Sequence, residues 1–185
     1  MQIRKRDYKI IRDDIPVPTL QDDGNYAPTN CLLVNFNIRS AVITEILKPF
    51  EFTGQFLRVI DRFDNPVLHA LTNANITTDN FNPSEDILSL AIHDLCGANN
   101  PADCILFETN YNYRSDGYGN YDLGAKYTHC GEPLLRAFQT LYANRGIRCR
   151  APVGADTFYT KHGFTQMPGT ESHFQWGPVN TGTSH

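Results

Sequence analysis

The sequence lacks the features that mark several large classes of protein. No apolar run approaches the ~20 residues that a membrane-spanning helix needs, and the amino terminus carries no apolar signal segment. The five cysteines form no close pairs, so neither the spacing of a metal site nor a disulfide framework is visible. We therefore expect a protein of a reducing compartment, without a membrane partner and without a bound metal.

Positive charge is also scarce. The net charge is −4, and the only basic run is Arg4–Arg6, so the concentrated positive charge that nucleic-acid phosphates require is missing. A nucleic-acid partner is not expected. The expected location is the cytoplasm, or the cytosol of a host cell if the protein is a secreted effector.

The length of 185 residues suits one domain with a sizeable core, and the sequence has no internal repeats. The first 30 residues are polar and contain Pro16, Pro18 and Pro28, a composition that favours irregular surface structure. We expect an irregular segment over 1–30, one domain over 31–177 and a carboxyl-terminal tail over 178–185.

The first part of the domain predicts a strand, a helix and a hairpin. The apolar pattern of 31–37 indicates a strand, and Ser40 can cap a short helix that runs to Leu47. Two apolar runs, 55–60 and 66–71, flank a turn-forming stretch and predict the hairpin.

The middle of the chain predicts a further helix over 83–96, with proline near its start. Its apolar residues share one helical face: Ile87, Leu88, Ala91 and Leu95. Residues 104–109 predict a strand. Residues 110–130 are rich in tyrosine, glycine and asparagine, which predicts either a long functional loop or a strand with a loop on each side.

The carboxyl-terminal third has the clearest pattern. Residues 132–145 place apolar side chains at helical spacing, and 147–153 alternates as a strand does. A short helix over 155–164 follows, in which Asp156 can cap the first turn and Gly163 can close the last one. Phe164 can then fold back onto the aromatic pair inside the helix. A hairpin of 164–167 and 172–176 across Pro168–Gly169 completes the series.

This order of helix, strand, short helix with Tyr159-Thr-Lys-His-Gly-Phe164, and hairpin resembles the second half of the GNAT-type N-acetyltransferase fold. The resemblance covers roughly 118–177 and is most specific over 155–164. It implies an α/β domain with a mixed, mostly antiparallel sheet and helices on both faces. In that pattern the helix over 83–96 is an insertion. The implied activity is direct transfer of an acetyl group from acetyl-CoA to a primary amine of a small molecule or protein.

The resemblance also implies a site for the coenzyme diphosphate, on backbone N–H groups at the amino end of the helix that begins near residue 132. Lys126 stands where the family has a basic residue, and Gly131 where it has its last glycine. His129 replaces the middle glycine, and Glu132 and Pro133 add a negative charge and remove a donor. The residues expected to assist coenzyme binding are Lys126, Thr128, His129, Gly131 and Arg136.

Tyr159 matches the family tyrosine that faces the coenzyme sulfur, which makes it the candidate general acid, although it also suits a purely structural aromatic cluster. The sequence offers three candidates for the general base and does not choose between them: Glu108, Asp122 and His129.

Two other functions remain open on the sequence. The chain can be a non-catalytic GNAT-shaped scaffold that binds a protein partner, which the departures at 129, 132 and 133 favour. It can also be a cysteine hydrolase built on Cys130, with His69, His93 or His162 as its base. His93 and Cys96 form only a two-residue candidate for a metal site.

Overall fold

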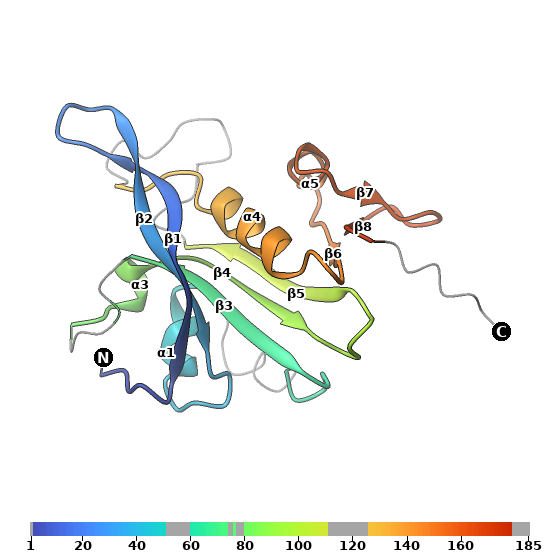
Figure 1. Ribbon diagram of the computed structural model, residues 1–185, viewed down its shortest axis with the longest axis horizontal. Helices are drawn as coiled ribbons and strands as arrows, with labels where there is room; N and C mark the ends of the chain where they lie inside the picture. The colour runs from blue at the N-terminus through green and yellow to red at the C-terminus, as the bar shows by residue number, and fades with distance from the viewer. Residues whose placement is uncertain (1, 51–59, 74–75, 77–79, 111–125, 179–185) are drawn as a thin grey trace.

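In the computed structural model, residues 2–50, 60–73, 76, 80–110 and 126–178 are described. They form an eight-stranded sheet in the order β1-β2-β3-β4-β5-β6-β8-β7 (Figure 1). The strands are β1 Tyr8–Leu20, β2 Tyr26–Phe36, β3 Pro66–Thr72, β4 Ile87–Asp94, β5 Ala102–Thr109, β6 Ile147–Arg150, β7 Thr165–Gln166 and β8 His173–Trp176. All neighbouring strands pair antiparallel except β5 and β6, which pair in parallel.

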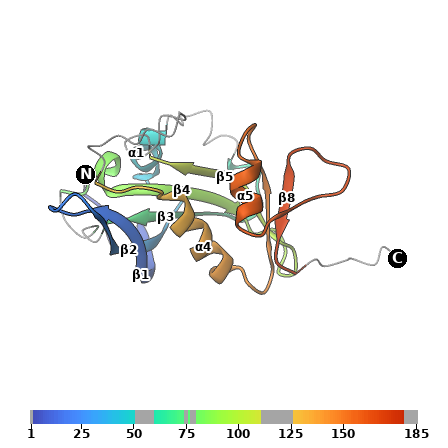
Figure 2. The same ribbon diagram turned by 90° about the horizontal axis from the view of Figure 1, so that it is seen from above.

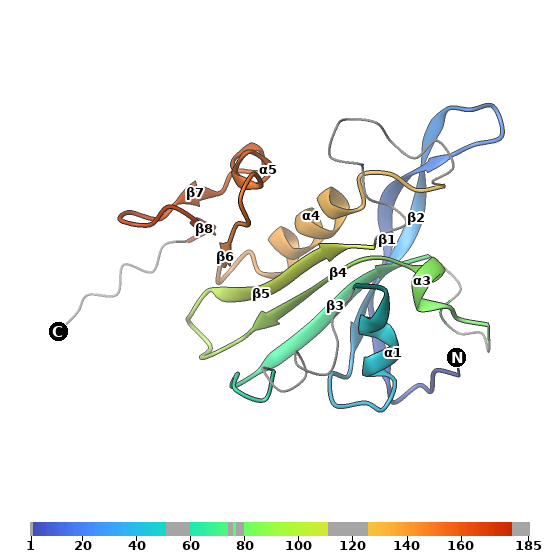
Figure 3. The same ribbon diagram turned by 180° about the vertical axis from the view of Figure 1, so that it is seen from behind.

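Helices cover both faces of the sheet. They are α1 Ile43–Leu47, the 3-10 turn η1 Lys48–Phe50, α3 Pro83–Asp86, α4 Gly131–Leu141 and α5 Asp156–Lys161. Helix α1 lies on one face and α4 on the other (Figures 2 and 3). Each face has its own apolar core, one beneath α1 and one beneath α4. The predicted fold class, a mixed and mostly antiparallel sheet with helices on both faces, is confirmed.

The prediction of an irregular segment over 1–30 is wrong, because this segment forms β1 and the start of β2. Within the described residues β1 is an edge strand, and an edge strand tolerates prolines because it needs no backbone donors on its outer side. Ile15, Val17 and Thr19 are buried at every second position, with Val17 packing in the core beneath α4. The prolines alternate with these residues and concealed the pattern.

The predicted helix over 83–96 is also wrong. Only Pro83–Asp86 is helical, with the Asn82 side chain accepting from the Ser84 N–H, and the chain then continues as β4. All eight residues of β4 are buried, because the strand lies inside the sheet with a core on each face. Such a strand is apolar on both sides, and its apolar residues therefore also match a helical period.

The carboxyl-terminal order of helix, strand, helix and hairpin is confirmed by α4, β6, α5 and the β7–β8 pair. Gly163 has φ 81°, and the Phe164 N–H donates to the Tyr159 carbonyl at 3.1 Å. The two aromatic rings meet with centroids 5.4 Å apart, as the predicted helix end requires. Asp156 is not the cap, because Ala155 takes that position and no side chain caps the helix.

Two details of the first half differ from the predictions. The Ser40 hydroxyl donates to Asp7 at 2.7 Å, and α1 begins after Val42 without a side-chain cap. The predicted strand over 66–71 is β3, and it pairs with β2 and β4. The predicted strand over 55–60 falls almost wholly outside the described residues.

No helix among the described residues combines the length and the apolar character needed to cross a membrane.

Candidate active site

The site begins where β5 and β6 separate. Their parallel pairing extends only from Ala102 to Cys104 on β5, opposite Ile147 to Cys149 on β6. On its other side β5 stays paired with β4 as far as Thr109. The register changes at Ile105, which is an extra residue between the pairs that β5 makes with His93 and Ile92. A bulge of this kind bends its strand, so β5 turns away from β6 and opens a slot between them.

The slot has a cavity volume of about 440 Å³. It is lined by residues of β5, of β6 and the turn after it, of α5 and of the β7–β8 turn: Cys104, Ile105, Leu106, Phe107, Glu108, Arg150, Ala151, Pro152, Val153, Tyr159 and Ser172. An extended chain can lie in such a slot and pair with the strand edges, as an added strand does.

A second cleft, of about 450 Å³, continues the slot toward the amino end of α4. Phe107, Glu108, Pro152 and Tyr159 line both cavities, so the two are adjacent. The further lining residues are Thr109, His129, Cys130, Gly131, Glu132, Ala155, Phe158, Lys161 and His162. The slot therefore leads from the separating strands to the space between the first turn of α4 and α5.

Tyr159 lies at the junction of these cavities. It is 5% exposed, and its ring packs against Phe158, Phe164 and Phe174. Its hydroxyl hydrogen-bonds the Cys149 thiol, and burial raises the pKa of the phenol well above its usual value. The hydroxyl therefore carries a proton throughout the physiological pH range. The tyrosine therefore packs at the helix end and also lines the slot.

Glu108 lines the same junction, but it lies on the α1 face of the sheet, whereas Tyr159 belongs to the core on the α4 face. It pairs with Leu90 of β4, whose side chain belongs to the core beneath α1, and directly paired residues share a face. Glu108 and Tyr159 line the same two cavities, and the charge of Glu108 contributes to the raised pKa of Tyr159. Of the four candidates for the general acid and the general base, Tyr159, Glu108 and His129 line the second cleft. Asp122 lies outside the described residues.

The turn before α4 contains a residue in the left-handed backbone region. His129 has φ 52°, and histidine is one of the few residues enriched in this left-handed region. The Ser89 hydroxyl donates to the Cys130 carbonyl at 2.8 Å and anchors the turn to β4. His129 thus takes the left-handed conformation that a glycine adopts without strain.

Gly131 is the first residue of α4 and faces the second cleft. A Cβ atom here would meet Thr109 at 3.4 Å, Phe107 at 3.5 Å and Phe158 at 3.8 Å. Thr109, Phe107 and Phe158 line the cleft, so the absence of a side chain at Gly131 leaves space there beside the helix end. Pro133 occupies the third helical position.

Glu132 places a carboxylate at the mouth of this cleft. It accepts hydrogen bonds from the Arg136 guanidinium at 2.9 and 3.1 Å, and its other oxygen lies 3.9 Å from Lys161 Nζ and 3.8 Å from His162 Nε2. The Arg136 hydrogen bond is the main reason that the pKa of Glu132 lies below its usual value. The carboxylate is thus ionised, and the side chains of Arg136, Lys161 and His162 lie around it at the first turn of α4.

The other predicted coenzyme ligands divide into two groups. The carbonyl of Lys126 accepts from the Leu20 N–H, and the Thr128 N–H donates to Pro18, so this stretch runs along β1. Neither residue lines the slot or the second cleft. Arg136 instead lines a neighbouring groove of about 570 Å³ between β1 and α4. His129 and Gly131 lie at the cleft, and the coenzyme contacts of all five residues remain predictions.

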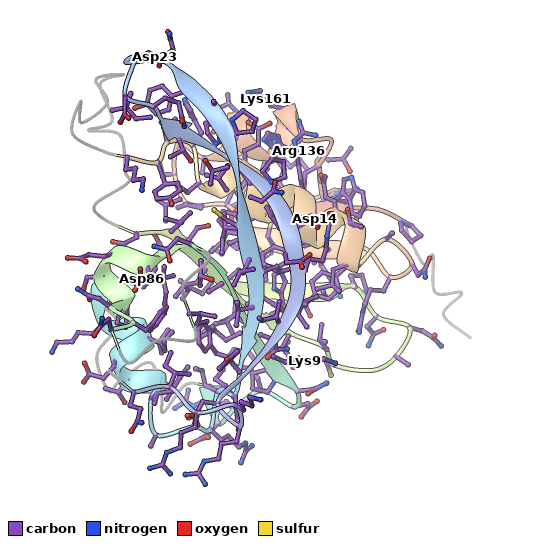
Figure 4. All side chains as sticks on the ribbon, turned by 60° about the vertical axis from the view of Figure 1, so that its left-hand side comes forward. Lys9, Asp14, Asp23, Asp86, Arg136 and Lys161 are labelled. Atoms are coloured by element: carbon purple, nitrogen blue, oxygen red, sulfur yellow. The ribbon has the colours of Figure 1, made fainter. Side chains whose placement is uncertain are left out.

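The groove beside β1 is bordered by positive charge. Arg12 of β1, Arg136 of α4 and Lys161 of α5 line it together with Glu132. Figure 4 shows Arg136 and Lys161 on one side of the molecule, with Asp14 of β1 below them. Asp14 accepts from the Arg12 guanidinium at 2.9 Å. Of the three basic residues, Lys161 also lines the cleft at α4.

The cysteine-based alternatives find little support. Cys130 is 1% exposed, and burial raises the pKa of its thiol to about 12, whereas a nucleophilic cysteine needs an accessible thiolate. His93 lies on β4, not on a helix, and the Cys96 thiol donates to Asp64 at 3.0 Å. Among the described residues no three His, Cys, Asp or Glu side chains form a metal-binding group.

His162 is the residue of the site whose role the sequence did not indicate. The sequence suggests it only as a base for Cys130, yet it lines the cleft at α4 beside Glu132. The sequence places His162 directly before Gly163, which ends α5. At this position its ring packs back against Phe158 of the same helix.

No family model and no curated protein sequence matches this chain. Among solved structures it is similar to a Bacillus anthracis strain Ames protein assigned as a streptothricin acetyltransferase, whose crystal structure contains acetyl-CoA. The alignment has 13% identity and a TM-score of 0.38, and it covers 95% of this chain and 87% of the other. This likeness assigns neither residues nor activity.

Proposed function

We propose that the protein transfers an acetyl group from acetyl-CoA to a primary amine. The observation that supports this most is the slot between β5 and β6, which runs past Tyr159 to the amino end of α4. Acetyl-CoA has matching parts: an extended arm with two amides, a reactive thioester at one end and a diphosphate at the other. Strand edges suit the arm, and the free donors and dipole of a helix amino end suit the diphosphate.

In this proposal the acceptor reaches the thioester from the Glu108 face of the sheet. The amine nitrogen bonds to the carbonyl carbon, and the C–S bond breaks with its electron pair leaving on sulfur. Glu108 accepts the amine proton, and the Tyr159 phenol gives its proton to the thiolate. The phenolate then regains a proton from water and Glu108 releases one, which restores the enzyme. No covalent enzyme intermediate is formed.

The first test is coenzyme binding, followed by transfer. At a CoA concentration about 100 times Kd, binding adds about 2.7 kcal/mol to the free energy of unfolding, so the melting temperature should rise. Release of free thiol from acetyl-CoA should then depend on an added amine, tested with small amines and with lysine-rich peptides. The proposal is wrong if CoA changes neither the melting curve nor a calorimetric binding signal.

The second candidate is a non-catalytic scaffold that binds a protein partner. Glu132 favours it, because its carboxylate lies where the diphosphate would bind. This candidate predicts a melting curve that CoA leaves unchanged, so the same measurement separates the two functions.

A further inference from the structure

The first turn of α4 and the end of α5 form a charged cluster around one carboxylate. Glu132 has the Arg136 guanidinium on one oxygen and the Lys161 ammonium and the His162 imidazole near the other. A carboxylate surrounded in this way at a helix amino end occupies the kind of position that a bound anion prefers. The cluster therefore has the composition of an anion site that already contains an internal anion.

His162 supplies independent evidence for a ligand. Its side chain is only 2% exposed, and neither ring nitrogen has a hydrogen-bond partner among the described residues. Its ring rests edge-on against Phe158 with centroids 4.8 Å apart, and the Gln139 amide donates to its carbonyl at 2.7 Å. A buried polar group without a partner is costly, and this one lines the cleft at α4. A ligand that accepts a hydrogen bond there would remove the cost.

We propose that Glu132 and His162 make this cleft a displaceable anion subsite: the Glu132 carboxylate holds the place of the ligand's diphosphate, which displaces it and binds Lys161 and the imidazolium of His162. That the anion is the diphosphate of a coenzyme rests on the proposed function. Glu132 then weakens binding but keeps the basic groups in position, and His162 couples binding to uptake of a proton.

The direction of the proton coupling follows from the charges that face His162. Burial lowers the pKa of the imidazole, and Arg136 and Lys161 lower it further, while Glu132 opposes them. A diphosphate carries more negative charge than the single carboxylate that it replaces. The imidazolium is therefore favoured in the bound state, and the complex should be tighter at pH 6 than at pH 8.

The first test removes the internal anion. Glu132→Gln keeps the size of the side chain but not its charge, and should tighten the Kd of dephospho-CoA about tenfold at low salt, as calorimetry would measure. Dephospho-CoA is the probe because its diphosphate does not titrate between pH 6 and 8. Glu45→Gln is the matched control, since Glu45 lies on α1 at the opposite face and pairs only loosely with Lys48 at 3.9 Å. An equal Kd for Glu132→Gln and wild type would overturn the displacement.

The second test concerns His162. The wild-type Kd for dephospho-CoA should fall about threefold to tenfold from pH 8 to pH 6, and His162→Gln should abolish most of that change. An unchanged pH dependence in this variant would show that His162 does not take up the proton. If His162→Gln does not fold, the wild-type profile and Glu132→Gln still decide the matter. If the wild type transfers acetyl groups but Glu132→Gln has the wild-type Kd for dephospho-CoA, this inference alone is rejected. If neither protein binds CoA, the proposed function is rejected as well.

Discussion

At the scale of single residues, the proposed chemistry depends on a few side chains that also stabilise the fold. Tyr159 is the clearest case, because its ring joins the aromatic cluster at the end of α5 and the residue also lines the slot. Gly131 is a second case, since it is the first residue of α4 and its lack of a side chain leaves space in the cleft. Substitutions that change one property and keep the other can separate these roles.

Tyr159→Phe keeps the ring and removes the hydroxyl. We expect acetyl turnover to fall about 100-fold or more, because a general acid is lost, while the Kd of CoA stays within about twofold. Tyr142→Phe is the matched control: Tyr142 is also buried, but its hydroxyl has no hydrogen-bond partner among the described residues and it does not line the slot. Equal turnover of Tyr159→Phe and wild type across the pH range would exclude the acid role.

Gly131→Ala adds one methyl group to the wall of the cleft. Alanine is a better helix former than glycine, and the nearest neighbours of the new atom lie at 3.4 Å and beyond, so the free energy of unfolding should change by less than about 1 kcal/mol. The Kd of CoA should weaken about tenfold, because the methyl group occupies space beside the helix end. Calorimetry and urea unfolding measure the two effects separately, and unchanged CoA affinity would contradict the placement of the ligand.

At the scale of elements, the strands β3 and β4 place two histidines beneath α4. His69 and His93 are buried, and their rings pack against Phe138 and Tyr142 of α4 and the turn after it. Burial lowers the pKa of His69 to about 4, and burial with the nearby His69 lowers the pKa of His93 to about 3. Both are therefore neutral in the folded protein at neutral pH.

This pair predicts a loss of stability in acid. Unfolded histidines titrate near pH 6.5, so below that value the unfolded state binds more protons and the free energy of unfolding falls as the pH decreases. Each histidine should contribute a loss of about 2 kcal/mol between pH 7.5 and pH 5, measured by urea unfolding. His93→Phe should remove the contribution of one histidine, about 2 kcal/mol over this pH range. If the free energy of unfolding depends on pH equally in His93→Phe and the wild type, the buried histidines are not the cause of the loss of stability in acid.

At the scale of the whole molecule, the amino-terminal hairpin completes the fold. Ile15 and Val17 of β1 belong to the same core as Leu134 and Phe138 of α4. The stretch before α4 is also held by β1, through the backbone hydrogen bonds to Leu20 and Pro18. The position of the amino end of α4, and with it the candidate site, therefore depends on β1.

A pair of substitutions on β1 tests this dependence. Val17→Asp buries a charge in the core and should unfold the protein or lower its stability by more than about 4 kcal/mol. Ile10→Asp changes the same strand at a position that is 41% exposed and should cost less than about 1 kcal/mol. Circular dichroism melts compare the two variants. Similar small effects would mean that the segment before residue 20 is a surface extension after all.

The parts of the fold that could be predicted are those with local signals. The end of α5 was predictable because Gly163 and Phe164 carry the helix stop within a few residues of Tyr159. By contrast β4 was mistaken for a helix, since a strand buried on both faces has no alternation to reveal it. Of the candidate site, Glu108 and Tyr159 were named from the resemblance, but their approach from opposite faces of the sheet was not predictable.

The sequence by itself determined the local elements of the carboxyl-terminal third and the absence of long apolar runs, because helix periods, stops and turns depend on neighbours along the chain. Only the tertiary structure decided that a bulge at Ile105 separates β5 from β6 and that Glu132 gathers Lys161 and His162 around the start of α4. These contacts join residues distant in sequence, and their geometry follows from how the sheet and the two helices pack.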